Sequence, residues 1–202
     1  MVHPFIRDAV INVCDSMYNC ECPLEEIIEF AKTHLGDNDP GLISVLHNAA
    51  IDDSENGESD QAVSTIKQAI ALRKKLGIET YAGLKSYIAC RVSLAWFYAE
   101  TGTAEEQDGE PNLFDAIPKD CETLLAMTER DNNPSLINES KLFTANRLYN
   151  LAHIALYYYS EHELALELIE KAIGLKLSVS TVEDEELRDY LELKGEIGGE
   201  AR

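Results

Sequence analysis

The sequence predicts an all-α fold. Apolar residues recur at spacings of three and four along almost the whole chain, as in Phe5, Ile6, Ala9 and Val13. No segment shows the clean alternation of apolar and polar residues that predicts a strand. We therefore expect eight or nine helices, near residues 4–19, 23–35, 40–52, 59–76, 80–101, 115–130, 135–159, 161–177 and 181–196.

The ends of these helices are marked by residues that replace or satisfy unpaired backbone groups. Pro23 precedes the first acidic helix turn, Asp39-Pro40 precedes the third helix, and Ser160 stands three residues before Glu163. A second capping box is predicted at Ser180 and Glu183. Helix stops are expected at glycines and at one Asn-Asn-Pro break, namely Gly36, Gly77, Gly102 and residues 132–134.

The composition is that of a folded but strongly acidic protein. The chain has 202 residues, of which 45% are hydrophobic, and its 17 Lys and Arg against 37 Asp and Glu give a net charge of −20. A surplus of this sign excludes binding to a phosphate backbone as the main activity, because phosphates require Lys and Arg. We expect a protein that binds no nucleic acid directly and no membrane, because no apolar run approaches the ~20 residues of a membrane span.

Two segments share one apolar template at identical spacing. Ala62, Ile66, Ala69, Ile70 and Leu72 form A-x3-I-x2-A-I-x-L, and the same template returns at Ala165, Ile169, Ala172, Ile173 and Leu175. The two alanines lie seven residues apart on one helix face and allow a neighbouring helix to approach closely. Each template helix is therefore expected to pack against the helix before it.

The residues ahead of each template resemble the first helix of a tetratricopeptide (TPR) repeat. Leu151-Ala152 matches the family's Leu-small pair, with one extra residue in the following turn and no glycine near Tyr159; in the earlier copy Gly57 supplies that glycine. The start of a third copy is suggested by Leu94-Ala95, Tyr98 and Gly102. The resemblance implies one all-helical domain, 1–202, with N-terminal helices over 1–39, TPR-like pairs over 40–177 with an acidic loop near 103–114, and a C-terminal capping helix and tail over 178–202. It also implies that antiparallel helical hairpins stack as a short TPR-like right-handed solenoid, and a generic helical bundle is the competing interpretation.

We find no motif of the common phosphate-binding, dinucleotide-binding, acyl-transfer or zinc-protease sites, so we expect no enzymatic activity and no cofactor. The odd, scattered set of cysteines does not predict a disulfide framework and favours a cytoplasmic protein. Cys14, Cys20 and Cys22 with His3 have the ligand types of zinc, but the C-x-C spacing is poor for a zinc site, and a packed Cys14 is the favoured interpretation. We therefore expect no metal.

The TPR resemblance implies that binding uses the polar and aromatic positions of each repeat's first helix. In the best-matched copy these positions form one stripe at spacings of three and four: Asn146, Tyr149, Asn150, His153 and Tyr157. The alternative is that the asparagines only bridge neighbouring helices.

Two functions of different classes follow. The first is an adaptor that binds a peptide or helix of another protein, one with a basic segment, while a homo-oligomer is left open. The second is an acidic inhibitor that imitates nucleic acid and occupies a basic site. A mimic needs carboxylates spread over one folded face, whereas many acidic residues here stand in predicted loops, which favours the adaptor.

Overall fold

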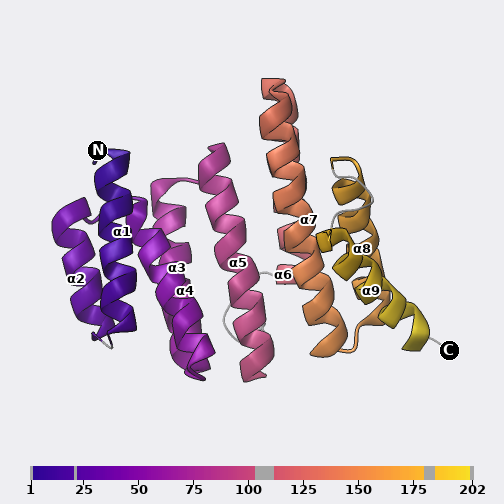
Figure 1. Ribbon diagram of the computed structural model, residues 1–202, viewed down its shortest axis with the longest axis horizontal. Coiled ribbons are helices and arrows are strands. Elements are labelled where there is room, and N and C mark those ends of the chain that lie inside the picture. Colours follow the sequence, from indigo (N-terminus) through magenta and orange to yellow (C-terminus); the bar gives the residue numbers. More distant parts are fainter. Residues whose placement is uncertain (1, 21, 103–111, 180–184, 201–202) are drawn as a thin grey trace. The chain divides into compact units, whose positions relative to one another are not determined.

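The computed structural model describes residues 2–20, 22–102, 112–179 and 185–200. The described residues form nine α-helices and no strand (Figure 1). The helices are α1 Pro4–Asn19, α2 Leu24–Leu35, α3 Gly41–Glu55, α4 Ser59–Leu76, α5 Tyr81–Thr101, α6 Leu113–Asp131, α7 Pro134–Tyr157, α8 His162–Leu177 and α9 Glu185–Glu200. The all-helical prediction is confirmed, and most boundaries agree within about three residues.

The predicted helix stops occur where the backbone turns left-handed. Gly36, Gly77 and Gly102 all have positive φ, and Asn132 at the end of α6 has φ 51°. Asn133 then caps α7, because its side chain accepts a hydrogen bond from the Ser135 N–H at 3.1 Å. Local signals therefore define the helix ends in most of the chain.

The predicted start at Ser160 is wrong in its mechanism. Ser160 has φ 55° and lies in the turn, and the residue at the N-cap of α8 is Glu161, which makes no side-chain capping bond. A residue in the left-handed conformation cannot present its hydroxyl as an N-cap does, since an N-cap residue is extended. The capping box at Ser180 and Glu183 and most of the acidic loop, 103–111, lie outside the described residues.

The chain divides into two compact units, residues 1–97 and residues 98–202, with the boundary inside α5. In unit 1, α1 packs against α2 and α3, and α3 pairs with α4. In unit 2, α7 packs against α6 and α8, while α9 packs mainly on α8 and also reaches α7. The pairs α3–α4 and α7–α8 are visible as neighbouring helices in Figure 1.

The template alanines form the cores of these two pairs. Ala62, Ala69, Ala165 and Ala172 are each 0% exposed. Close contact between helices requires small side chains at the crossing, and the larger Ile66 and Ile169 are likewise fully buried beside them. The prediction that each template helix packs against the helix before it is confirmed.

Candidate partner-binding site

The predicted stripe lies on α7, whose orientation is fixed by its contact with α8. Ala152 and Ala155 are fully buried, and α8 presents Ala165 and Ala172 to the same interface. Residues of the stripe stand on a different face of α7, because three- and four-residue steps from Asn146 keep them together and away from these alanines. Packing of one face thus sets the direction in which the other face points.

Helix α9 covers part of this stripe. The ring of Tyr190 stacks on Tyr149, with centroids 4.5 Å apart and 13° between the planes. The hydroxyl of Tyr190 also donates a hydrogen bond to Asn146 Oδ1, and the Tyr157 hydroxyl donates to the carboxylate of Glu196. Three of the five predicted site residues therefore contact α9.

The other two residues of the stripe lie between these contacts. His153 is half-buried, and its ring lies 4.3 Å from that of Tyr157. Burial lowers the pKa of His153, while the Glu196 carboxylate partly opposes that change, so the imidazole is neutral at pH 7. Asn150 is half-buried beside them. The structure thus brings all five predicted residues onto one surface with an amide, a neutral imidazole and a tyrosine that is 53% exposed.

Helix α9 is held in place by its apolar face and by two ion pairs to α8. Leu187, Leu193 and Ile197 are buried. Lys176, which is itself buried, bonds to the exposed Glu186, and Lys194 lies 2.7 Å from Glu170. These contacts place the acidic face of α9 next to the stripe.

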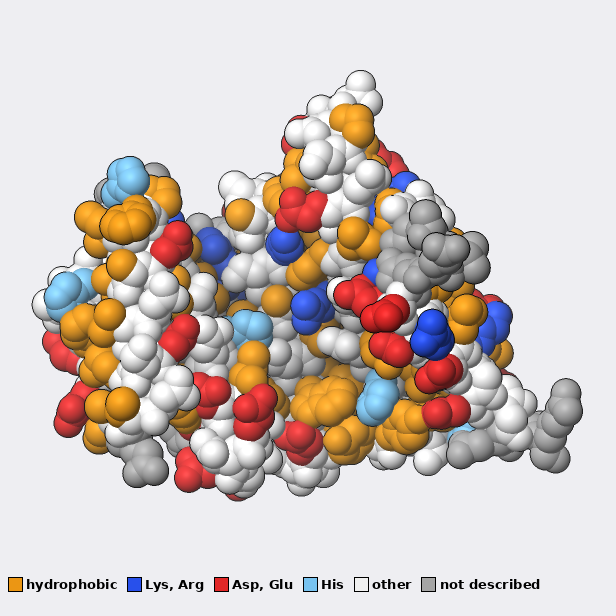
Figure 2. All heavy atoms as spheres, viewed as in Figure 1, with side chains coloured by type: hydrophobic (Ala, Val, Ile, Leu, Met, Phe, Trp, Pro, Cys, Tyr) orange, Lys and Arg blue, Asp and Glu red, His pale blue; other side chains and the backbone are white. Residues whose placement is uncertain are grey.

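Three carboxylates of α9 border the predicted site. Asp189, Glu196 and Glu192 all act on Tyr149, and burial together with their negative charge raises the pKa of its hydroxyl. All three are exposed. Figure 2 shows Asp and Glu side chains gathered over α9. An aromatic and amide surface with an acidic border can contact apolar groups and attract a cation at its edge.

The sequence reasoning missed Tyr190 and Glu196 as members of this surface. The available signal was the spacing of Leu187, Tyr190 and Leu193, which places the tyrosine on the buried face of α9. Nothing in that spacing identifies Tyr149 as its stacking partner. Finding the pair required the packing of α9 in three dimensions.

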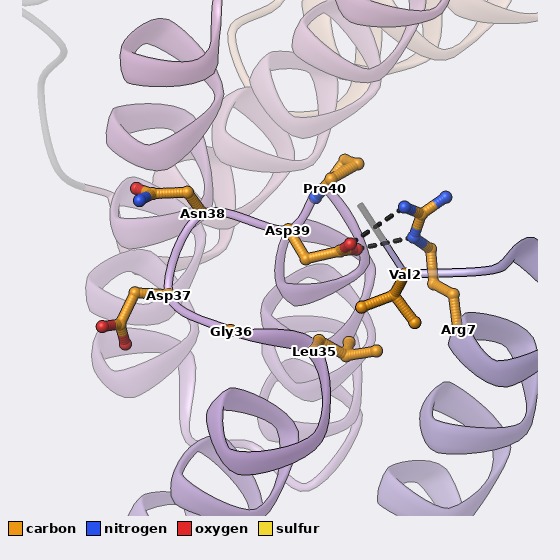
Figure 3. Close-up of a pocket in the computed structure, with 8 residues that line it drawn as sticks. All are labelled: Val2, Arg7, Leu35, Gly36, Asp37, Asn38, Asp39 and Pro40. Carbon is orange, nitrogen blue, oxygen red and sulfur yellow. Dashed lines mark hydrogen bonds and ion pairs between the residues drawn. The ribbon is translucent and has the colours of Figure 1, made fainter.

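The turn between α2 and α3 holds a cavity of about 530 Å³ (Figure 3). Arg7 of α1 forms a two-pronged ion pair with Asp39, with Nε–Oδ1 at 2.5 Å and Nη2–Oδ2 at 2.9 Å. Asp39 Oδ1 also accepts a hydrogen bond from the Gly41 N–H at 2.8 Å. A Cβ on Gly41 would lie 2.8 Å from Arg7 Cγ, so this close approach requires glycine. Arg7 and Asp39 thus bond to each other and to the backbone of the turn. We call this ion pair the clip, because it joins α1 to the turn and its role is structural.

The cysteines are placed separately. Cys14 is buried, and its thiol lies 4.0 Å from the Ile27 carbonyl oxygen, whereas Cys20 is exposed. Burial raises the pKa of Cys14 to about 11. Within the described part of the chain, no three His, Cys, Asp or Glu residues are grouped so that they could hold a metal ion. Cys14 therefore packs as a small apolar side chain.

The described residues form paired antiparallel helices with small residues at the crossings, an arrangement found in TPR-like helical-repeat folds. The sequence matches no family model, and no curated protein is similar enough to count as a relative. Solved structures do match. One crystal structure of a putative kinesin light chain from Podosopora anserina, with nearly identical TPR-like repeats, has a TM-score of 0.56 at 16% identity, covering 99% of this chain and 90% of that chain.

A second structure of a putative kinesin light chain from the same organism has a TM-score of 0.50 at 16% identity, covering 100% of this chain and 99% of that one. At this identity the likeness concerns the fold. The chain thus has a TPR-like helical-repeat fold, as the apolar template and its flanking residues predict. Among the described helices, none has the length and apolar character needed to cross a bilayer.

Proposed function

We propose that this chain is a non-catalytic protein-interaction module that binds a basic peptide or helix of a partner on the α7 stripe. TPR-like repeats serve protein interaction in general, which supports the class of function. The observation that carries the finer proposal is the acidic border of the stripe, where Asp189, Glu192 and Glu196 act on Tyr149. A partner segment with Lys or Arg beside an apolar residue matches this arrangement.

The contacts of α9 support a helix as the bound element. The ring of Tyr190 on α9 already stacks on Tyr149, and the Tyr190 hydroxyl donates a hydrogen bond to Asn146. These contacts leave Asn150 and His153 next to the exposed Tyr157. A second amphipathic segment that lies along these three side chains would extend the surface that α9 begins.

The test uses synthetic amphipathic peptides in three versions, with Lys, Glu or Gln at the polar positions, and titrates each against the whole chain. We expect the Lys version to bind most tightly and its association rate to fall with added salt, because attraction between charges is screened. The double variant Asn150→Ala with His153→Ala should lose about tenfold in affinity while circular dichroism shows an intact fold.

Tyr158→Ala is the matched control, because this tyrosine is exposed at the same helix end but stands outside the stripe. It should bind like the unchanged chain. Equal binding by the double variant would move the site elsewhere. Loss of binding only on Asp189→Asn, Glu192→Gln and Glu196→Gln together would favour the acidic mimic, since a mimic depends on its carboxylates and not on the stripe.

A further inference from the structure

Another cavity, of about 380 Å³, lies in unit 2 between α6, α7 and α8. Its floor is formed by Thr144 and Leu148 of α7, one helical turn apart, and Leu125 and Leu175 line it from the two flanking helices. The cavity is on a different face of α7 from the partner-binding stripe, because the stripe contacts α9 and the floor lies between α6 and α8. Its volume falls in the lower range of small-molecule sites.

One polar side chain in the floor has unused hydrogen-bonding capacity. Thr144 is 1% exposed, and within the described residues its hydroxyl makes no hydrogen bond of good geometry. The thiol of Cys121 lies within its reach, and because sulfur is a weak acceptor, the hydroxyl can donate only a weak hydrogen bond to it while its oxygen lone pairs accept none. One turn earlier on α7, Ser140 forms a 2.9 Å hydrogen bond with Thr128 of α6. The same interface therefore satisfies one hydroxyl and leaves the other facing the cavity.

Two further lining residues are unfavourable choices for a helix. Gly174 lies inside α8 and Pro118 inside α6, and both residue types weaken a helix interior. A Cβ at Gly174 would meet nothing within 4 Å, so no neighbouring group requires glycine there. A larger side chain at this position would instead occupy open space at the cavity wall. Three departures from ordinary helix and core composition thus meet at one cavity.

We propose that this cavity binds a small neutral molecule with two fused aromatic rings and one ring N–H, such as an indole, whose N–H donates to the Thr144 hydroxyl. An engineered apolar cavity of about 150 Å³ holds benzene, so this larger one has room for a second ring. The charged groups nearby do not favour an ionic ligand. Lys171 is already paired with Glu167 at 2.8 Å, and Glu122 of the lining is exposed to solvent. Cys121 supplies no thiolate, because burial raises its pKa to about 12.

The experiment titrates the whole chain with indole and, separately, with 1-benzothiophene, which has nearly the same shape but no N–H. Amide chemical shifts should change in α6, α7 and α8 around the lining residues. Thr144→Val keeps the side-chain volume and should keep the fold. It should weaken indole binding about tenfold and leave benzothiophene binding unchanged, since only indole loses a hydrogen bond.

Gly174→Leu should abolish binding of both molecules by occupying the space at the wall. Gly195→Leu is its control, because this glycine of α9 also has nothing within 4 Å of a built Cβ and lies outside the cavity. The proposal is overturned if indole at millimolar concentration shifts no amide around the cavity, or shifts only amides elsewhere. It is equally overturned if Thr144→Val binds indole as tightly as the unchanged chain.

Discussion

The hairpins α3–α4 and α7–α8 share one apolar template but close their turns differently. In both, a left-handed residue stands five positions before the first template alanine: Gly57 with φ 81° and Ser160 with φ 55°. Glycine adopts this conformation at little cost, whereas in serine the Cβ comes close to the following carbonyl oxygen and makes the conformation less stable. The template thus specifies the helix contact, and the turn tolerates a less suitable residue once that contact is made.

The hydrogen bonds of the two turns show how the extra residue is accommodated. The Glu58 N–H bonds to the Asp53 carbonyl, five residues back, at 2.8 Å. In the second hairpin the Glu161 N–H reaches six residues back to the Ala155 carbonyl, at 2.9 Å. The second turn is therefore one residue longer, yet it keeps a backbone hydrogen bond that closes the end of the helix.

The first helices of the two hairpins also differ in how their polar side chains are used. On α3, Asn48 donates to Asp15 of α1 at 3.0 Å, and His47 bonds to Ser93 of α5 at 2.8 Å. On α7, three stripe residues are partnered by α9, yet Tyr157 remains 53% exposed. An exposed aromatic side chain therefore remains on α7, which is why we propose the partner site there.

The largest effect is expected from breaking the Arg7–Asp39 clip of unit 1. Asp39→Asn should lower the free energy of unfolding by about 1.5–3 kcal/mol, because the bond from the half-buried Arg7 to a buried, charged acceptor is lost. Urea denaturation measures this. Asp37→Asn, in the same turn but with its side chain pointing away in Figure 3, should change little.

The Arg7–Asp39 pair should also make the stability of the protein depend on pH. The Arg7 guanidinium holds the pKa of Asp39 below its ordinary value of about 3.9. A lowered carboxylate pKa contributes stability that is complete above the unfolded value and is lost as the pH falls through the folded value. The stability of the unchanged chain should therefore fall below pH ~4 more steeply than that of Asp39→Asn. Parallel curves would contradict the role of this pair.

The next prediction compares the two template contacts directly. Ala69→Leu and Ala172→Leu should each lower the free energy of unfolding by ~1–3 kcal/mol. Both alanines are fully buried where the helices cross, so a larger side chain does not fit there. Urea unfolding of both variants provides the measurement. Unchanged stability in either would show that its hairpin does not depend on the close crossing.

The smallest expected effects have opposite signs in the two turns. Ser160→Gly should stabilise the protein by about 0.5–1 kcal/mol, because relief of the left-handed strain exceeds the added freedom of the unfolded chain. Gly57→Ser should destabilise it by about 1 kcal/mol for the same reason. Thermal melting compares the two. Changes of the same sign would mean that the turns are not equivalent in backbone demand.

Much of the fold could be predicted because its signals are local. Pro134 and Asn133 start α7, Gly77 ends α4, and the spacing of Ala62 and Ala69 identifies a buried face, all within a few residues of where they act. Ser160 is the exception, because a serine is common both as a cap and in a turn, and its conformation is decided by the closure of the hairpin.

The sequence by itself determined the helices, the two template hairpins and the five residues of one α7 stripe. Only the tertiary structure decided that Tyr190 stacks on Tyr149, that Glu196 reaches Tyr157, and that Thr144 faces a cavity. The physical reason is that periodicity identifies which face of a helix is apolar but not which helix covers it. Partners 39 to 44 residues apart are chosen by the packing of whole helices, which no local pattern encodes.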